Sequence, residues 1–273
     1  MNRFLTELNK YKNIFVLTGA GISLPSGIPT YRDSKGQWTG SQPIQHGDYI
    51  KDPAMRQRYW ARSMVGWRNF GKAQPNAAHR ALAEAEQSRR LSLLVTQNVD
   101  RLHQRAGSDQ VVDLHGRLDQ VVCLDCGDLS KRAAMQVRLE AANAGFDVQA
   151  SQLRPDGDAD VSDALIAQVR VPECQQCAGV LKPDVVFFGD NVPRDRVAQC
   201  QQALAESDAL LVIGSSLQVF SGFRFCRQAS ERGIPIFSIN PGETRADEMI
   251  NHKSAVPAEE LLHEWASALN SSA

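Results

Sequence analysis

The chain has 273 residues, of which 42% are hydrophobic, and its 30 Lys and Arg against 31 Asp and Glu give a net charge of −1. This length and composition are typical of a globular protein with one large domain or two moderate ones. The even charge balance excludes a global field that would attract nucleic acid or an anionic membrane. Since no run of about 18 apolar residues occurs and the first residues are polar, we expect a cytoplasmic monomer without a membrane or nucleic-acid partner.

A glycine-rich turn follows the first apolar run, Ile14 to Leu17. Glycine has no side chain, so its backbone N–H can approach a phosphate closely. The full GxGxxG pattern is absent because Leu24 occupies the third glycine position, and a simple tight turn fits the pattern equally well. The turn residues that we assign as candidates for dinucleotide binding are Gly19, Ala20 and Gly21.

The segment after this turn carries an aromatic residue and an arginine. Two prolines and a glycine within residues 25–29 exclude a regular helix, so we predict a structured loop that presents Tyr31 and Arg32. Such a loop could close over a nucleotide, although an ordinary surface loop has the same composition.

The aromatic segment between residues 42 and 70 is predicted to contain an amphipathic helix. Tyr59 and Arg62 are three residues apart, so they would share one face of that helix. Two interpretations remain open. The pair could recognise an anionic group, or Arg62 could be a surface side chain that stacks on its neighbour.

Amide and carboxylate side chains interrupt the next apolar run. Leu91 to Val95 reads as a buried strand, and Gln97, Asn98 and Asp100 follow it directly. Ligands bind at the carboxyl ends of strands in open α/β sheets, whereas an Asx turn that caps a helix would use the same residue types. A short apolar stretch at residues 111–114 then delivers His115, which we expect in a cleft.

Two CxxC pairs separated by 47 residues account for four of the six cysteines. Each pair directs two thiolates to one point, and two pairs complete a closed tetrahedral zinc site, which is structural rather than catalytic. Two unrelated knuckles or a redox pair are the alternatives. The predicted zinc ligands are Cys123, Cys126, Cys174 and Cys177. Between them, residues 154–160 form an acidic run that lacks the glycine and glutamate of a calcium loop, so we expect a solvated turn.

After the second CxxC pair, apolar strands alternate with helices, and small polar residues stand at the strand ends. This alternation predicts a doubly wound parallel α/β sheet. The strand-end residues that could bind phosphate or ribose are Gly214, Ser215, Ser216 and Asn240.

Several strings occur in the order found in the sirtuins, and they cover residues 13–240. They are TGAGIS, SGIPTYR, TQNVD, LHG, the two CxxC pairs, KPDVVFFGD, GSSLQV and SIN. The longer strings PIQHGDYI, QRYWARSMVGW, LRPDGD and FGDNV resemble the class II branch, that of mitochondrial sirtuin four and its bacterial relatives. The stretch after residue 240 matches poorly.

The resemblance implies a Rossmann-like NAD-binding domain (residues 1–118 and 183–273) and a smaller zinc-binding module (119–182, with part of 35–75). It implies removal of an acyl group from lysine with NAD as co-substrate, releasing nicotinamide and O-acyl-ADP-ribose. His115 would be the catalytic base, and Asn98 and Asp100 would act on the nicotinamide ribose. The remaining NAD contacts would be Gly19, Ala20, Gly21, Tyr31, Arg32, Gln97, Gly214, Ser215, Ser216 and Asn240, and the acyl-peptide strand would be Val186, Phe187 and Phe188.

Two alternatives to deacylation remain at this point. The same NAD site could serve mono-ADP-ribosyl transfer to protein, or the chain could be an NAD-sensing partner protein without catalysis. The presence of His115, Asn98 and Asp100 disfavours the second alternative. The spacing of Tyr59 and Arg62 also looks like the pair that class III sirtuins use for acidic acyl groups, so we expect these residues to contact the substrate.

Overall fold

A six-stranded parallel sheet forms the larger part of the molecule in the computed structural model, which describes residues 2–33, 35–39, 43–146, 148, 154 and 156–270. The strand order is β3-β2-β1-β7-β8-β9, and every pairing is parallel. The strands are β1 (Ile14–Thr18), β2 (Leu91–Thr96), β3 (Val111–Asp113), β7 (Ala209–Ile213), β8 (Ile236–Ile239) and β9 (His252–Ser254).

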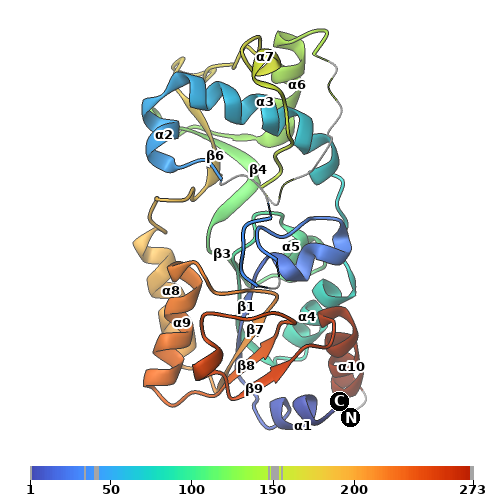
Figure 1. Ribbon diagram of the computed structural model, residues 1–273. Helices are drawn as coiled ribbons and strands as arrows, with labels where there is room; N and C mark the ends of the chain where they lie inside the picture. The colour runs from blue at the N-terminus through green and yellow to red at the C-terminus, as the bar shows by residue number, and fades with distance from the viewer. Residues whose placement is uncertain are drawn as a thin grey trace.

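Helices cover both faces of this sheet (Figure 1). Successive strand residues point to opposite faces, so Ile14 and Val16 pack with one helix layer while Phe15 and Leu17 pack with the other. The first layer contains α1 (Arg3–Leu8), α4 (Ala77–Gln87) and α10 (Ala258–Asn270), and the second contains α8 (Arg194–Ala205) and α9 (Phe220–Glu231). Burial on both faces explains why the strands read as continuous apolar runs.

A second, antiparallel sheet has the order β5-β4-β6 and lies at the other end of the molecule (Figure 1). Its strands are β4 (Gly116–Cys123), β5 (Leu129–Lys131) and β6 (Leu181–Val185). A separate core joins this sheet to nearby helices through Trp60, Met64, Met135 and Leu139. The helices of this part are α2 (His46–Lys51), α3 (Pro53–Phe70), α6 (Arg132–Ala142) and α7 (Asp163–Ile166).

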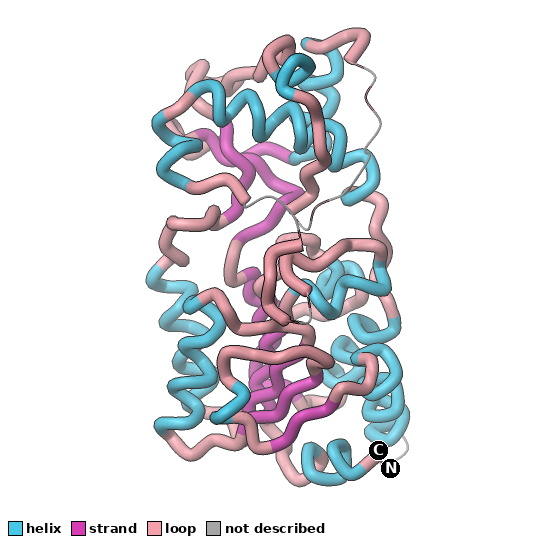
Figure 2. Tube along the Cα trace, in the orientation of Figure 1, coloured by secondary structure: helices cyan, strands magenta, loops and turns pink. Residues whose placement is uncertain are grey.

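Loops gather between the two sheets, at the carboxyl ends of β1, β2 and β3 (Figure 2). The remaining short helices are η1 (Ala20–Ser26), α5 (Leu102–Arg105) and η2 (Asp247–Met249). A parallel sheet with helices on both faces and a small antiparallel module confirms the predicted fold class. The domain boundaries inferred from the resemblance stay a prediction.

The glycine-rich turn differs in detail from the expectation. Residues 20–26 form a 3₁₀ helix that includes Pro25 and ends at Gly27, whose φ of 83° lies in the left-handed region. Most 3₁₀ helices are short pieces, and runs of more than about three or four residues are uncommon. Along the described residues, we find no helix with the length and apolarity to cross a membrane.

Candidate active site at the edge of the parallel sheet

Two glycine turns pack directly against each other beyond β1 and β7. The Gly21 N–H donates to Gly214 O at 2.8 Å, and the Gly19 N–H donates to Ile213 O at 2.9 Å. A Cβ atom at Gly21 would lie 2.8 Å from the Gly214 Cα, so any side chain there would push the turns apart. The two predicted phosphate-binding turns therefore pack backbone against backbone, with no side chain between them.

Gln97 connects these turns to the end of β2. Its side-chain Oε1 accepts from Ser215 Oγ at 2.6 Å, and its backbone N–H donates to Thr18 O at 2.9 Å. Asn240 follows β8 and donates from Nδ2 to Gly242 O at 3.0 Å, so it lies at the same edge of the sheet. Ser216 accepts through its backbone oxygen from the Arg245 N–H at 3.0 Å. The structure thus places the predicted strand-end residues along one edge.

Asn98 and Asp100 share one partner, the hydroxyl of Ser23. Ser23 Oγ donates to Asp100 Oδ2 at 2.6 Å and lies 3.1 Å from Asn98 Nδ2, which also donates to Gly19 O at 3.1 Å. Asp100 Oδ1 accepts from the Leu102 N–H at 2.9 Å. Burial raises the pKa of Asp100, and the Ser23 hydrogen bond partly offsets this. Hydrogen bonds rather than ion pairs therefore fix this carboxyl group.

Two buried histidines support Ser23 and β1 from behind. His79 Nε2 lies 3.5 Å from Ser23 Oγ, His103 Nε2 lies 2.9 Å from Thr18 Oγ1, and the two rings are 4.8 Å apart. Burial lowers the pKa of His79 to about 4 and that of His103 well below its usual value. Both rings are neutral at pH 7, so neither histidine places a positive charge beside Ser23 or Thr18.

Both ring nitrogens of His115 have partners. Nδ1 lies 2.9 Å from the backbone oxygen of Gln97, and Nε2 lies 2.7 Å from Ser221 Oγ. A carbonyl oxygen only accepts, so Nδ1 carries the proton and Nε2 keeps its lone pair. Burial, together with the positive charge of Arg196, lowers the pKa of His115 to about 4. The ring is neutral at pH 7 and is a base through Nε2.

The predicted acyl-peptide strand begins next to His115. The Val186 N–H donates to His115 O at 2.8 Å, and Phe188 O accepts from the His46 N–H at 2.8 Å. Phe187 instead packs in the core of the small module, with its ring 5.5 Å from that of Tyr59. Neighbouring residues of an extended segment point to opposite sides, which explains this burial.

An aromatic group joins the predicted NAD loop to this segment. The ring of Tyr31 lies 6.0 Å from that of Phe188 and 6.3 Å from that of Trp38, in edge-to-face contacts. The guanidinium carbon of Arg32 lies 3.9 Å from the centre of the Trp38 ring, and Arg32 Nη1 donates to Gly36 O at 2.7 Å. The loop is therefore held by its own contacts, and Tyr31 faces the segment that follows β6.

The four predicted zinc ligands meet at one point. Cys123 Sγ lies 3.6 Å from Cys177 Sγ, Cys126 Sγ lies 3.8 Å from Cys174 Sγ, and all four sulfurs fall within 4.8 Å of one another. A Zn–S distance of about 2.3 Å in a tetrahedron requires sulfurs about 3.8 Å apart. The four thiols therefore fit a structural zinc ion.

The two knuckles of this cluster have the same backbone pattern. The Gly127 N–H donates to Cys123 O at 3.0 Å, and the Ala178 N–H donates to Cys174 O at 2.9 Å. Gly127 and Ala178 occupy equivalent positions with φ of 74° and 59°. Alanine is strained in this left-handed region, whereas glycine is not.

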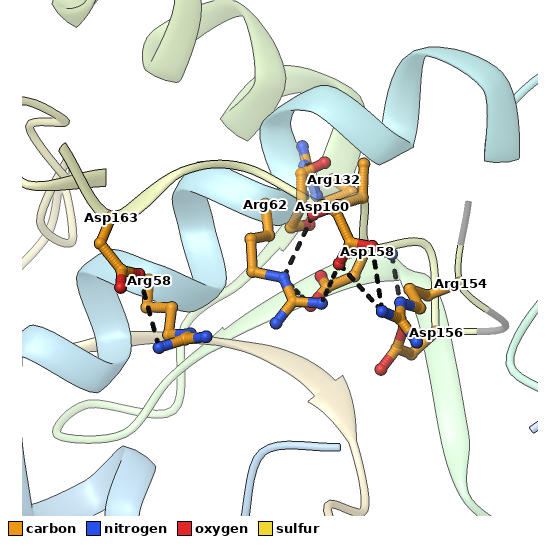
Figure 3. A network of polar contacts seen from close by, with 10 residues as sticks. Arg58, Arg62, Arg132, Arg154, Asp156, Asp158, Asp160 and Asp163 are labelled. Carbon is orange, nitrogen blue, oxygen red and sulfur yellow. Dashed lines mark hydrogen bonds and ion pairs between the residues drawn. The ribbon is translucent and has the colours of Figure 1, made fainter. Parts of the chain in front are cut away.

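A cavity of about 280 Å³ opens between α3, the Tyr31 loop and the side chains of Arg154, Asp156 and Asp158. Arginine and aspartate side chains line it in equal numbers, and Figure 3 shows most of them. Arg62 Nε lies 3.6 Å from Asp158 Oδ2, and Arg62 Nη2 lies 3.4 Å from Asp160 Oδ1. The guanidinium of Arg62 is therefore already paired by carboxylates of the chain, and it is not the free surface arginine of the second interpretation.

The acidic run between residues 154 and 160 is not the solvated turn that we expected. Asp158 is 7% exposed, and burial together with the nearby Asp156 raises its pKa well above the usual value. Arg62 and Arg154 surround this turn, and Arg154 Nη2 donates to Asp160 Oδ1 at 2.9 Å. The expectation was wrong because Arg62, from a distant part of the sequence, and Arg154, from the run itself, offset the desolvation of the carboxylates.

Ser23 and Ser221 were not among the candidate residues. Ser23 stands inside the TGAGIS string, so its closeness to the turn was a signal that could have identified it. Ser221 lies 106 residues from its partner His115 in the sequence, and no motif marks it.

Comparison with known proteins matches residues 19–221 to the Sir2 family. The chain is 52% identical over 244 residues to NAD-dependent protein deacetylase 2 of Bradyrhizobium diazoefficiens, covering 89% of each chain. It is 51% identical over 253 residues to NAD-dependent protein deacetylase of Bordetella bronchiseptica, covering 93% of this chain and 92% of the relative.

Solved structures agree with this result. A Sir2–p53 peptide–NAD+ complex has a TM-score of 0.77 at 29% identity and covers 98% of both chains. A Sir2 homolog–NAD complex has a TM-score of 0.75 at 29% identity and covers 99% of this chain and 94% of the other. The chain belongs to the Sir2 family.

Proposed function

We propose that this Sir2-family protein is an NAD-dependent protein deacetylase that acts on acetyl-lysine peptides and proteins. The observation that carries this proposal is the meeting of Asn98, Asp100 and neutral His115 beside two glycine turns. The names of the deacetylase relatives and the peptide and NAD bound in similar structures support it. Family membership alone would leave the reacting groups unassigned.

The NAD contacts that we propose divide into two groups. The backbone of Gly19, Ala20, Gly21 and Gly214 would approach the phosphates, because no side chain obstructs these turns. Ser215, Ser216 and Asn240 would contact the adenosine side from the ends of β7 and β8. Tyr31, Arg32 and Gln97 would border the nicotinamide ribose, and Tyr31 would shield it from water.

The NAD co-substrate supplies an ADP-ribosyl group, whose bond to nicotinamide breaks as the acyl oxygen of the lysine amide bonds to the ribose carbon. Asn98 and Asp100 would orient the ribose, since Ser23 and Gly19 hold their side chains in place. Fixed orientation lowers the entropic part of the barrier, and a water-free surrounding prevents simple hydrolysis.

His115 would act in the next step as general base. A ribose hydroxyl must lose its proton to attack the former amide carbon, and the Nε2 lone pair of neutral His115 can accept that proton. The acyl group then leaves on the ribose, and the lysine amine is released. Atoms balance when one water is added before lysine leaves, giving lysine, nicotinamide and O-acyl-ADP-ribose.

The zinc ion that we assign to Cys123, Cys126, Cys174 and Cys177 would have four thiolate ligands and no open position. Its role is structural, because a closed ligand set has no place for a bound water. The four thiolates would hold the two knuckles together at the end of β4 and before β6.

We also propose that the chain belongs to the class II branch and accepts acyl groups larger than acetyl. The cavity beside Tyr31 supports this, since its 280 Å³ exceeds what an acetyl group fills. Tyr59 and Arg62 line it, and Asp158 Oδ1 is buried there without a hydrogen-bond partner among the described residues. Because Arg62 is paired with Asp158 and Asp160, an acidic acyl group would compete with these carboxylates.

The decisive test is the His115→Ala variant with an acetyl-lysine peptide and NAD. We expect product formation to fall at least about 10²-fold, the usual contribution of a general base. His263→Ala in α10, an exposed histidine, is the matched control and should keep parental activity. Near-normal turnover in His115→Ala would refute the assignment of the base. Mass spectrometry must find ADP-ribose on the acyl group, since ADP-ribose retained on protein would indicate mono-ADP-ribosyl transfer.

A further inference from the structure

The start of α9 contacts the proposed base directly. Ser221 is the second residue of this helix, and its Oγ lies 2.7 Å from His115 Nε2. The proposed NAD site and the zinc cluster do not require this serine. The N-cap position of the helix is occupied by Val219, and no side-chain capping bond is formed there. The Ser221 hydroxyl is therefore not used to cap the helix.

The direction of this hydrogen bond follows from the tautomer of His115. Nδ1 faces the carbonyl oxygen of Gln97 and must carry the ring proton, so Nε2 only accepts. Ser221 therefore donates its hydroxyl proton to the same lone pair that the proposed mechanism uses. A hydrogen bond at each nitrogen restricts rotation of the ring about its Cβ–Cγ bond more than the bond at Nδ1 alone does.

Close packing fixes the position of Ser221. A Cβ atom at Gly222 would lie 2.6 Å from Gln97 Nε2, so the first turn of α9 rests against the Gln97 side chain. Gln97 in turn bonds Ser215 through its side chain and His115 through its backbone oxygen. Ser221, His115 and Gln97 thus form a closed set of contacts from α9 and the ends of β3 and β2.

We propose that Ser221 is a positioning residue for His115. It fixes the orientation of Nε2 in the free protein and gives up its place to the ribose hydroxyl when the substrates are bound. The inference rests on the proposed function of His115 as base. Because the base acts only after nicotinamide has left, Ser221 should influence the later transfer step and leave the cleavage of NAD unaffected.

The test separates these two steps in the Ser221→Ala variant. Exchange of labelled nicotinamide into NAD, with acetyl-lysine peptide present, reports the first step, and formation of O-acetyl-ADP-ribose reports the complete reaction. We expect exchange within about threefold of the parental rate and product formation reduced by about 10–100-fold, the scale of a misplaced catalytic group. Ser221→Thr, which keeps a hydroxyl, should restore much of the product formation.

Ser230→Ala is the matched control, since Ser230 is exposed near the other end of the same helix. Equal loss of exchange and product formation in Ser221→Ala would indicate a merely structural role and overturn the inference. Unchanged product formation would overturn it as well. The His115→Ala variant in the same two assays separates the two hypotheses. Normal product formation in His115→Ala would show that the proposed base is wrong. Loss of product formation in His115→Ala together with normal product formation in Ser221→Ala would refute the role of Ser221 alone.

Discussion

The two parts of the molecule reach stability by different means. The parallel sheet is covered on both faces by helices, and two of its buried titratable side chains, His79 and His103, are neutral. The antiparallel module has one smaller core, four clustered thiols and a buried cation, Arg132, which lies 4.9 Å from the Trp67 ring centre and donates to Ser63 O at 3.1 Å.

This difference agrees with the separate roles that we propose for the two parts, reaction chemistry and acyl recognition. The sheet domain supplies a stable edge on which Asn98, Asp100 and His115 are held by hydrogen bonds. The small module holds charged residues around a cavity. A charged side chain there can change its ion-pair partner more readily than a side chain of a packed core can change its contacts. The proposed reaction chemistry therefore belongs to the parallel-sheet part, and the proposed acyl recognition belongs to the part that carries the four-cysteine cluster.

Removal of zinc should have the largest effect, and it should unfold the small module while the parallel sheet stays folded. Zinc binding contributes about 10–16 kcal/mol in small zinc-finger peptides, as much as the whole stability of a typical domain. A chelator should therefore abolish amide-exchange protection in β4, β6 and α6 while β1 and β7 stay protected. Hydrogen exchange with mass spectrometry measures both regions in one sample.

Cys177→Ala should reproduce the effect of the chelator, and Cys200→Ala is the control because that thiol is buried in the other domain. Simultaneous loss of protection in β1 and β7 would show that the two parts unfold together. The proposed independence of the sheet domain would then be wrong.

Acid should act on the sheet domain through its buried histidines. The pKa of His79 is about 4 when folded, against about 6.5 when unfolded, so the unfolded chain binds more protons between these values. The contribution of His79 is fully present above pH 6.5 and is lost as the pH falls toward 4, a change of about 3 kcal/mol in the free energy of unfolding. Urea unfolding at several pH values measures this slope.

A variant without the titrating ring isolates this effect. His79→Gln should be less stable at pH 7.5, but its free energy of unfolding should fall less steeply between pH 6.5 and 5. His263→Gln should keep the parental slope, since His263 is exposed. An unchanged slope in His79→Gln would assign the acid sensitivity to other groups.

The smallest expected effect concerns the second knuckle. Ala178 has a φ of 59°, where glycine has no penalty, so Ala178→Gly should stabilise the small module by about 0.5–1 kcal/mol. Gly127→Ala, at the equivalent position of the first knuckle, should destabilise it by a similar amount. The chelator concentration that releases zinc measures both changes, and equal midpoints for the two variants would contradict the argument.

Local patterns predicted the fold and gave the residues of the candidate site, whose roles stay a prediction. The strands of the parallel sheet are continuous apolar runs, and Gln97, Asn98 and Asp100 follow β2 directly, so periodicity and position were sufficient. The four cysteines were recognisable because CxxC spacing is a local signal.

Contacts between distant segments were not predictable in the same way. Ser221 meets His115 across 106 residues, and the buried Asp158 lies among arginines that include Arg62 of the distant helix α3. Phe187 lies in the predicted acyl-peptide segment but faces the core, since the alternation of an extended strand depends on a register that the sequence does not reveal.

One hydrogen-bonded ribbon connects the cysteine cluster to the proposed base. Cys123 is paired with Leu181 at one end of β4 and β6, and Gly116 with Val185 at the other, next to His115. The thiols outside the cluster, Cys200 and Cys226, are buried, which raises the pKa of each to about 12 and makes them unreactive. In a search for inhibitors, an electrophilic or oxidising compound would therefore inactivate the protein by reacting with the four-cysteine cluster. Such a compound would inhibit without binding at the proposed NAD site.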